Sequence, residues 1–262
     1  MSAAAAVEVR ELTTPDECHA SGDLYAEVWG LPPAETPMAG EVLIALAHSG
    51  NYVVGAHAPS GELIGGATAW FGVDEEDGTR FLHSHVAGVL AASQGLGVGM
   101  ALKQHQRRWC RDRGVAEIRW TFDPLVRRNA WFNLTRLGAV GVRYVEDYYG
   151  GLQDGINAGG ATDRMVVHWA VEQPDERASG SGAGAYPVLD VARGDAPVIV
   201  DPDPPDVDLA VWLPEDIVAL RRTDPALAGQ WRLAQRAVLG PAMAKGYRAT
   251  SVNPEGWLLL SR

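Results

Sequence analysis

The segment Val89-Leu-Ala-Ala-Ser-Gln-Gly-Leu-Gly-Val-Gly-Met-Ala-Leu102 places three alternating glycines between a predicted strand and a predicted helix. Glycine has no Cβ, so backbone N–H groups in such a loop can turn towards one point. Together with the positive end of the helix dipole, these N–H groups can bind phosphate or pyrophosphate. The segment therefore predicts an anion-binding loop at residues 94–99. A glycine turn that only tightens the strand-to-helix corner fits the spacing equally well.

Three kinds of phosphate loop share this strand–glycine–helix order, and two of them disagree with the residues present. A Walker loop ends in Lys followed by Ser or Thr, whereas Met100 and Ala101 follow the last glycine. A dinucleotide fingerprint needs Gly or Ala where Met100 stands. Its ribose-binding acid should end the next strand, but Glu117 begins that strand. The remaining interpretation is a pyrophosphate loop for coenzyme A.

Periodicity and turn signals on either side of the loop predict a mixed α/β order. Helices are expected from Thr14 to the Pro pair after Leu31, and at residues 39–48, 98–113 and 128–137. Strands are expected at residues 7–12, 51–57, 62–71, 81–90, 115–122, 140–145 and 164–171.

The last third of the sequence has a different character. Residues 173–206 contain Ser-Gly and Asp-Pro runs, which predict a linker or an extended arm with short edge strands at 188–191 and 198–200. Residues 207–262 then run β-α-α-β-β, the order of residues 7–71. This order indicates either a duplicated half-domain or a common arrangement of elements. We therefore predict three parts: a domain at 1–172, a linker at 173–206 and a C-terminal region at 207–262.

Two motifs in this order resemble the GNAT superfamily of acetyltransferases. Gln94-Gly-Leu-Gly-Val-Gly99 resembles its acyl-CoA signature, Arg/Gln-x-x-Gly-x-Gly/Ala. Asn129-Ala-Trp-Phe-Asn-Leu-Thr-Arg-Leu-Gly138 resembles its downstream helix, with a shorter span from Asn to Gly. The stretch from Leu82 to Ala139 is also similar to an uncharacterised bacterial subgroup of predicted acetyltransferases. The resemblance covers about residues 7–171. It implies an α/β (α+β) fold, with a mixed, splayed central sheet flanked by helices, followed here by a C-terminal β-α-α-β-β extension.

The resemblance also implies acetyl-CoA as cosubstrate, with no metal. The backbone N–H groups of the loop would hold the pyrophosphate, that is, those of Gln94, Gly95, Leu96, Gly97, Val98 and Gly99. Val89 and Leu90 would pair with the pantetheine arm, and Asn129 would lie near the pantetheine or the thioester. The Tyr that the family uses to protonate the leaving thiolate falls on Leu134 or on Arg136, depending on the direction of counting. The usual acid is therefore absent or supplied from elsewhere.

Candidate catalytic residues follow from what acetyl transfer to an amine requires, namely a base for the amine proton and an acid for the thiolate. His83 and His85 alternate along one strand, so they share a face, and an unperturbed His titrates near about pH 6.5. His85 is the favoured base; packed core histidines are the alternative. Asp123 could receive a substrate ammonium or cap a turn. Tyr149 could replace the missing acid or pack as an aromatic, and residues 150–162 read as a substrate lid.

The expected function is direct transfer of acetyl from acetyl-CoA to the amine of a small molecule or amino-acid-like acceptor. The alternative is a non-catalytic acyl-CoA-binding or sensing module, which the missing Tyr favours. A further hypothesis makes the C-terminal region an arm for homodimer formation.

The amino-acid composition limits which classes of partner and which cellular compartment we expect for this protein. The 262 residues carry a formal net charge of -11, which argues against nucleic acid and anionic membranes as partners. No stretch approaches about 18 consecutive apolar residues. Two cysteines and a start without a basic leader favour a cytoplasmic protein. Residues 103–143 nevertheless hold ten of the 22 Lys and Arg residues, a basic island suited to a polyanionic coenzyme.

Overall fold

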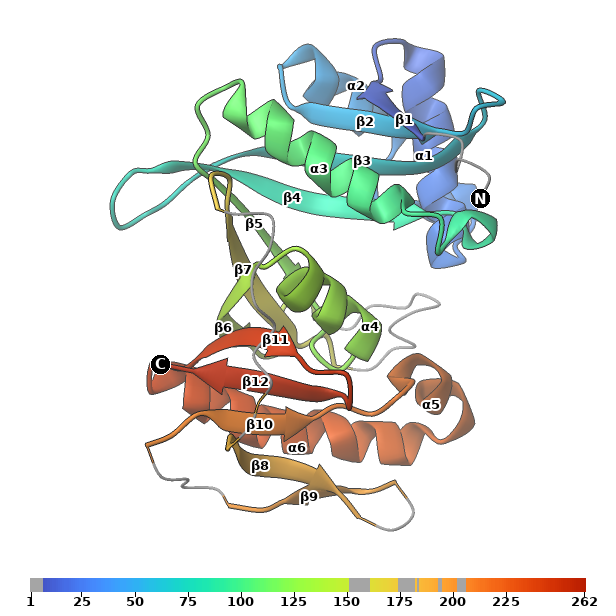
Figure 1. Cartoon of the computed structure of the whole chain (residues 1–262). Helices are drawn as coiled ribbons and strands as arrows, with labels where there is room; N and C mark the ends of the chain where they lie inside the picture. The colour runs from blue at the N-terminus through green and yellow to red at the C-terminus, as the bar shows by residue number, and fades with distance from the viewer. Residues whose placement is uncertain (1–6, 151–160, 174–181, 183, 193–194, 202–205) are drawn as a thin grey trace, which may run out of the picture. The chain divides into compact units, whose positions relative to one another are not determined.

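The computed structural model describes residues 7–150, 161–173, 182, 184–192, 195–201 and 206–262 (Figure 1). The chain forms two compact units, Met1–Arg119 and Trp120–Arg262, which are taken separately below. This division follows contacts in the folded chain. The predicted division at residues 172 and 206 follows composition instead, and it stays a prediction.

Unit 1 is an antiparallel sheet with helices on both faces. Its strands lie side by side in chain order, and only the last one, β5, runs parallel to its neighbour. Figure 1 shows α3 on one face of strands β2–β4, with α1 and α2 on the other. The strands are β1 (Glu8–Glu11), β2 (Tyr52–His57), β3 (Leu63–Val73), β4 (Arg80–Val89) and β5 (Glu117–Phe122), whose last three residues belong to unit 2. The helices are α1 (Pro15–Trp29), α2 (Gly40–His48) and α3 (Val98–Arg111), with short 3-10 turns at Pro33–Glu35 and Ala91–Ser93.

Helix α1 begins where the sequence predicts. The hydroxyl of Thr14 accepts the N–H of Glu17, and the carboxylate of Glu17 accepts the N–H of Thr14, which makes a capping box. Pro15 occupies the first turn, and Gly30 ends the helix in the left-handed conformation. Local sequence alone sets both ends of this helix.

Unit 2 is built around a series of mostly antiparallel strands. Its strand order is β7-β6-β11-β12-β10-β8-β9, in which β8 and β10 are parallel. The strands are β6 (Val140–Val145), β7 (Arg164–Ala170), β8 (Tyr186–Val191), β9 (Pro197–Ile199), β10 (Leu209–Trp212), β11 (Arg248–Val252) and β12 (Trp257–Ser261). The helices are α4 (Arg127–Ala130), which continues as a π-helix over Trp131–Arg136, α5 (Ile217–Thr223) and α6 (Pro225–Ala244).

A glycine lets the C-terminal hairpin join the sheet. Strand β11 meets β6 where Ala249 pairs with Gly141. A Cβ on Gly141 would lie 2.5 Å from Met165 Sδ and 2.8 Å from Ala249 Cβ, so a side chain there would push the strands apart. The close approach makes the C-terminal strands part of the core of unit 2.

The predicted fold class is confirmed: the chain is a mixed α/β (α+β) protein with helices flanking the sheet. The C-terminal order β-α-α-β-β also appears as β10-α5-α6-β11-β12. Its strand pairing differs from that of residues 7–71. There the first strand, β1, pairs with the second, β2, whereas in the C-terminal region the first strand, β10, pairs with the third, β12. None of the helices in the described parts of the chain is long and apolar enough to cross a membrane.

Candidate active site

The glycine loop forms the corner between β4 and α3. Gly95 and Gly97 have φ angles of 80° and 82°, which are left-handed values that favour glycine. A Cβ at either position would meet open space, so backbone conformation rather than crowding requires glycine there. Residues 94–97 are exposed.

Helix α3 begins without a side-chain cap. Its first residue is Val98, and the first intrahelical bond runs from the N–H of Ala101 to the carbonyl of Gly97 at 3.0 Å. The N–H groups of Val98, Gly99 and Met100 come before this bond, as in the first turn of any α-helix. The loop therefore presents backbone donors at the positive end of a 14-residue helix, a geometry that suits an oxyanion.

The end of β4 is held against its neighbours on one side. Val89 pairs with Gly65 of β3, and the N–H of Leu90 donates to the carbonyl of Ile64 at 3.0 Å. The carboxamide of Gln94 donates to the carbonyl of Val89 at 3.4 Å, which ties the loop to the strand. The parallel register of β4 with β5 covers the pairs Leu82–Ile118 and His83–Arg119, at the opposite end of β4 from Val89.

A β-bulge lies in the middle of β4. Thr68 pairs with Val86 and Ala69 pairs with Ser84, so His85 is an extra residue that pairs with no residue of β3. A bulge leaves one residue outside the ladder and occurs often beside active sites. The sequence carries no signal for this bulge.

The two histidines of β4 lie on one face, as predicted, and both pack against Trp70. Ring centroids are 4.6 Å apart for Trp70 and His85, 5.2 Å for Trp70 and His83, and 5.8 Å between the histidines. Burial lowers the pKa of His83 to about 4, helped by the nearby charges of His85 and Lys103. Burial also lowers the pKa of His85 below its usual range. Both rings are therefore neutral at pH 7 and able to accept a proton.

Helix α3 buries cationic side chains as well as apolar ones. Lys103 and Arg107, which stand four residues apart on one side of the helix, are both buried. Lys103 Nζ donates to Ser84 Oγ at 3.0 Å and to Gln106 Oε1 at 3.1 Å. Burial lowers the pKa of this lysine to about 7. Because β4 presents a serine towards the helix, a cation is satisfied where the helical pattern alone would place an apolar residue.

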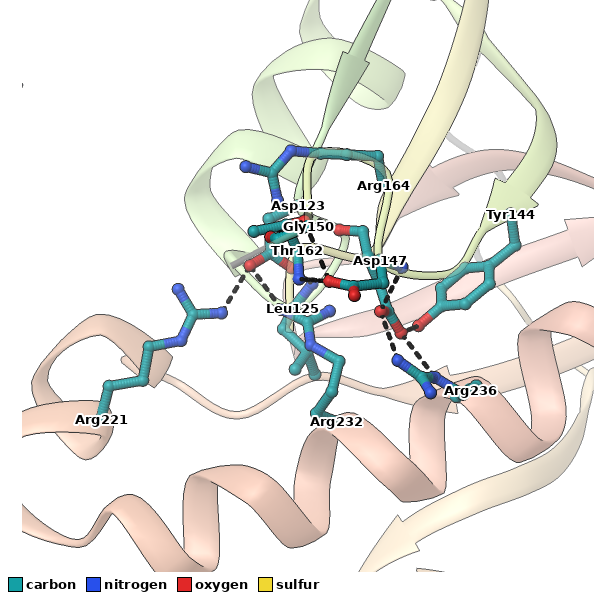
Figure 2. A network of polar contacts seen from close by, with 11 residues as sticks. Asp123, Leu125, Tyr144, Asp147, Gly150, Thr162, Arg164, Arg221, Arg232 and Arg236 are labelled. Atoms are coloured by element: carbon teal, nitrogen blue, oxygen red, sulfur yellow. Dashed lines mark hydrogen bonds and ion pairs between the residues drawn. The ribbon is translucent and has the colours of Figure 1, made fainter. Parts of the chain in front are cut away.

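Asp123 is buried at the start of unit 2, just after β5. Its Oδ1 accepts the N–H of Leu125 at 3.0 Å, which is the turn-capping contact named as the alternative. Its Oδ2 accepts from Arg221 Nη2 at 2.5 Å and Arg232 Nη2 at 2.6 Å (Figure 2). Burial by itself would raise the pKa of Asp123, but the two arginines outweigh it and hold that pKa below its usual range. Both oxygens of this carboxylate thus have partners within the protein.

The other candidates in unit 2 are more exposed. Tyr149 is 40% exposed, packs edge-on against Tyr148, and lies under the guanidinium of Arg164 at 5.3 Å. Asn129 is exposed on α4. Leu134, where the family Tyr would fall, is buried in the π-helical turn that accompanies the short span from Asn129 to Gly138. Residues 151–160 of the predicted substrate lid lie outside the described part of the chain.

The structure thus gathers the predicted residues into two groups. His85, Val89, Leu90 and the loop residues 94–99 belong to unit 1, whereas Asp123, Asn129 and Tyr149 belong to unit 2. The described residues contain no group of three or more His, Cys, Asp or Glu that could hold a metal ion.

A second polar cluster surrounds Asp163 in unit 2, and sequence reasoning missed it. Asp163 is fully buried and accepts from Arg236 at 2.7 and 3.0 Å and from the hydroxyl of Tyr144 at 2.5 Å (Figure 2). Burial would raise the pKa of Asp163, but its hydrogen bonds with Arg236 and Tyr144 lower it. The only signal in the sequence is that three arginines, at 221, 232 and 236, lie in the helical part of the predicted C-terminal region.

No protein-family model and no curated protein sequence matches the chain. Among solved structures, it is similar to a putative phosphinothricin N-acetyltransferase, with 13% identity and a TM-score of 0.50 over 64% of this chain and 100% of that one. A putative GNAT-family acetyltransferase from Desulfovibrio desulfuricans gives 18% identity and a TM-score of 0.48, over 63% of this chain and 99% of that one. The Escherichia coli ribosomal-protein-S18-alanine N-acetyltransferase gives 14% identity and a TM-score of 0.49, over 67% of this chain and 100% of that one.

At 13% identity and a TM-score of 0.50, the likeness to the putative phosphinothricin N-acetyltransferase shows a shared fold and no more. The putative phosphinothricin N-acetyltransferase is matched over its whole length by 64% of this chain, so the rest of this chain has no counterpart in that structure.

Proposed function

We propose that the protein transfers an acetyl group from acetyl-CoA to the amine of a small molecule or amino-acid-like acceptor. The observation that carries this proposal is the uncapped start of α3 behind the left-handed Gly95 and Gly97. Because Gly95 and Gly97 carry no side chain, the backbone donors at this helix N-terminus would stay open to an oxyanion. The GNAT-type fold supports the same conclusion.

The residues of unit 1 suit the coenzyme. The N–H groups of residues 95–99 would bind its pyrophosphate, as oxyanions bind at helix N-termini. The N–H of Gln94, which was also expected to bind the pyrophosphate, donates instead to the carbonyl of Ala91 at 3.3 Å. Val89 and Leu90 would pair with the pantetheine arm through their backbone, and Asn129 would lie near it. When bound, acetyl-CoA supplies the activated acyl group, and the chain orients the acceptor and moves protons.

The bulge at His85 gives β4 a chemical role in this proposal. An N–H group outside the ladder can donate to the thioester carbonyl and stabilise the oxyanion that forms when the amine attacks. The neutral His85 ring would accept the proton that the amine nitrogen loses. The carbon–sulfur bond then breaks, and Tyr149 is the proposed donor of a proton to the thiolate, because Leu134 cannot serve.

Asp123 is the weakest of the proposed catalytic groups. A substrate ammonium would have to displace Leu125, Arg221 or Arg232 from its oxygens. Its part in the reaction would then be to position the arginines. A cytoplasmic location, membership of the bacterial subgroup and a homodimer are further parts of the proposal.

The test is coenzyme binding by calorimetry together with thiol release from acetyl-CoA in the presence of an amine library. His85→Ala should lower kcat by about 100-fold or more, as loss of a general base does, while the coenzyme Kd stays unchanged. His48→Ala, an exposed histidine at the end of α2, is the matched control and should behave as the wild type. Equal kcat in His85→Ala and wild type would remove His85 from the mechanism.

The alternative is a non-catalytic acyl-CoA-binding module, and the apolar Leu134 at the usual acid position favours it. The same experiment separates the two. Tight coenzyme binding without thiol release across the library would establish the binding module in place of the enzyme.

A further inference from the structure

Helix α6 carries two polar side chains into the interior of unit 2. Arg232 is 6% exposed and Gln235, three residues later, is completely buried. Residues three apart on an α-helix lie on the same face. One face of α6 therefore presents a guanidinium and a carboxamide side by side.

Both side chains have buried atoms without a hydrogen-bond partner among the described residues. Arg232 uses Nη2 to reach Asp123, but its Nη1 has no partner. The Nε2 and Oε1 atoms of Gln235 also have none. Buried polar groups are almost always paired, and leaving one unpaired costs folding free energy. These atoms amount to two donors and one acceptor on one face of α6, which is a pattern that a ligand can complete.

The surroundings of Arg232 favour an anion. Arg221 shares Asp123 with Arg232, and Arg164 lies close enough for the charge of Asp123 to raise its pKa against the lowering effect of burial (Figure 2). The neighbouring carboxylate, Asp163, is already paired with Arg236. Arginines from β7, α5 and α6 thus gather around the single carboxylate of Asp123. Arg164 covers the half-exposed ring of Tyr149, where the cluster reaches the surface.

We propose that Arg232 and Gln235 bind the carboxylate group of a small organic acid. The carboxylate would accept from Arg232 Nη1 and Gln235 Nε2, in the planar geometry that arginine offers to carboxylates. Gln235 Oε1 would accept from an N–H on the same ligand, as an α-amino acid provides. This inference rests on the proposed function in one respect, which is that the amino acid bound here is the acceptor of the acetyl group.

The test uses the full-length protein and three sets of probes: the proteinogenic amino acids, their carboxamides and inorganic phosphate. At least one free amino acid should raise Tm and bind in calorimetry, and its carboxamide should not. Arg232→Gln and Gln235→Met should each weaken that binding by about 10- to 100-fold, the loss expected for a charge-assisted hydrogen bond. Arg222→Gln, at an exposed position of α5, is the matched control and should bind as the wild type.

Three results would overturn the proposal. They are no stabilisation by any amino acid, equal stabilisation by acid and carboxamide, and stabilisation by phosphate alone.

Gln235→Met also separates a binding role from a structural one. Methionine keeps the volume and removes both unpartnered atoms, so without ligand its Tm should equal or exceed that of the wild type. A lower Tm with unchanged amino-acid affinity would mean that Gln235 is structural and would contradict the proposal. This variant keeps the test decisive if Arg232→Gln does not fold.

Turnover distinguishes this inference from the proposed function. With an amino acid as acceptor, Gln235→Met should raise the KM for that acceptor about tenfold or more and change kcat little. Amino-acid binding without thiol release would support the carboxylate site and contradict its role as the acceptor site. Thiol release with amines that lack a carboxylate, at KM values equal to those of amino acids, would support the enzyme and contradict the acceptor assignment.

Discussion

The glycine loop of unit 1 and the arginine–aspartate cluster of unit 2 both suit negative charge, but they are built differently. The loop would use backbone N–H groups of consecutive residues, 95–99, at the start of one helix. The cluster uses side chains from distant segments, such as Asp123 and Arg232, which are 109 residues apart. Side-chain identity therefore matters little in the loop beyond its glycines, whereas each member of the cluster depends on its partners and on burial.

The largest effect is expected from removing the carboxylate at the centre of the cluster. Asp123→Ala leaves the buried Arg232 and the partly buried Arg221 without their shared partner, so the free energy of unfolding should fall by about 3–5 kcal/mol. Urea denaturation measures this loss. Asp206→Ala removes an exposed pair with Arg262 in the same unit and should cost less than about 1 kcal/mol. Equal losses of unfolding free energy in the two variants would show that the buried cluster stabilises the protein no more than the exposed ion pair does.

The pH dependence of stability should differ between His83 in unit 1 and Asp123 in unit 2. The pKa of His83 is about 4 in the folded chain because of its burial, against about 6.5 when unfolded. The unfolded state binds more protons between these values, so stability falls as pH drops from 6.5 to 4, by roughly 2–3 kcal/mol. The carboxyl of Asp123, with its lowered pKa, loses its contribution only at more acidic pH.

Urea unfolding of His83→Gln at several pH values between 7 and 4 checks this assignment. The variant should lose most of the slope, whereas the exposed His48→Gln should keep it. An unchanged slope in His83→Gln would place the proton-linked loss elsewhere in the chain.

A single glycine should decide coenzyme affinity in the loop. Alanine at position 97 pays the left-handed penalty of about 1–2 kcal/mol or shifts the backbone and its donors, so Gly97→Ala should bind coenzyme A about tenfold more weakly. Gly50→Ala, with a φ of 79° and open space around its Cβ, carries the same penalty at another exposed turn. It should lower stability to a similar extent and leave coenzyme affinity as it is. Calorimetry with coenzyme A would contradict this account if both variants bound equally.

The smallest effect is expected within the second carboxylate group. Tyr144→Phe removes one hydrogen bond to Asp163, which keeps Arg236 and the N–H of Asp147. The free energy of unfolding should fall by about 1 kcal/mol. Tyr148→Phe changes an exposed hydroxyl and should have no measurable effect. A loss of several kcal/mol in Tyr144→Phe would mean that Asp163 depends on this hydroxyl more than on its arginine.

Local patterns predicted the elements of this chain well. Thr14, Glu17 and Pro15 set the start of α1, and the strand-to-helix order around residues 89–102 is as expected. The edge strands at 188–191 and 198–200 correspond to β8 and β9. These features depend on neighbours within a few residues, so one sequence contains the information for them.

Features that depend on distant partners escaped prediction. The burial of Lys103 is satisfied by Ser84 of another element, and the bulge at His85 is defined by its register with β3. The C-terminal β-α-α-β-β region repeats the order of residues 7–71, yet its first strand, β10, pairs with β12. The order of elements along the chain does not predict this pairing.

The sequence by itself determined the succession of helices and strands, the glycine loop and the shared face of His83 and His85, because periodicity and backbone freedom act over short distances. Only the tertiary structure decided which charges are buried and with whom. Arg232, Arg221 and Asp123 meet because three separate segments fold against one another. The free energy of a buried charge depends on such partners, and residue type alone does not specify them.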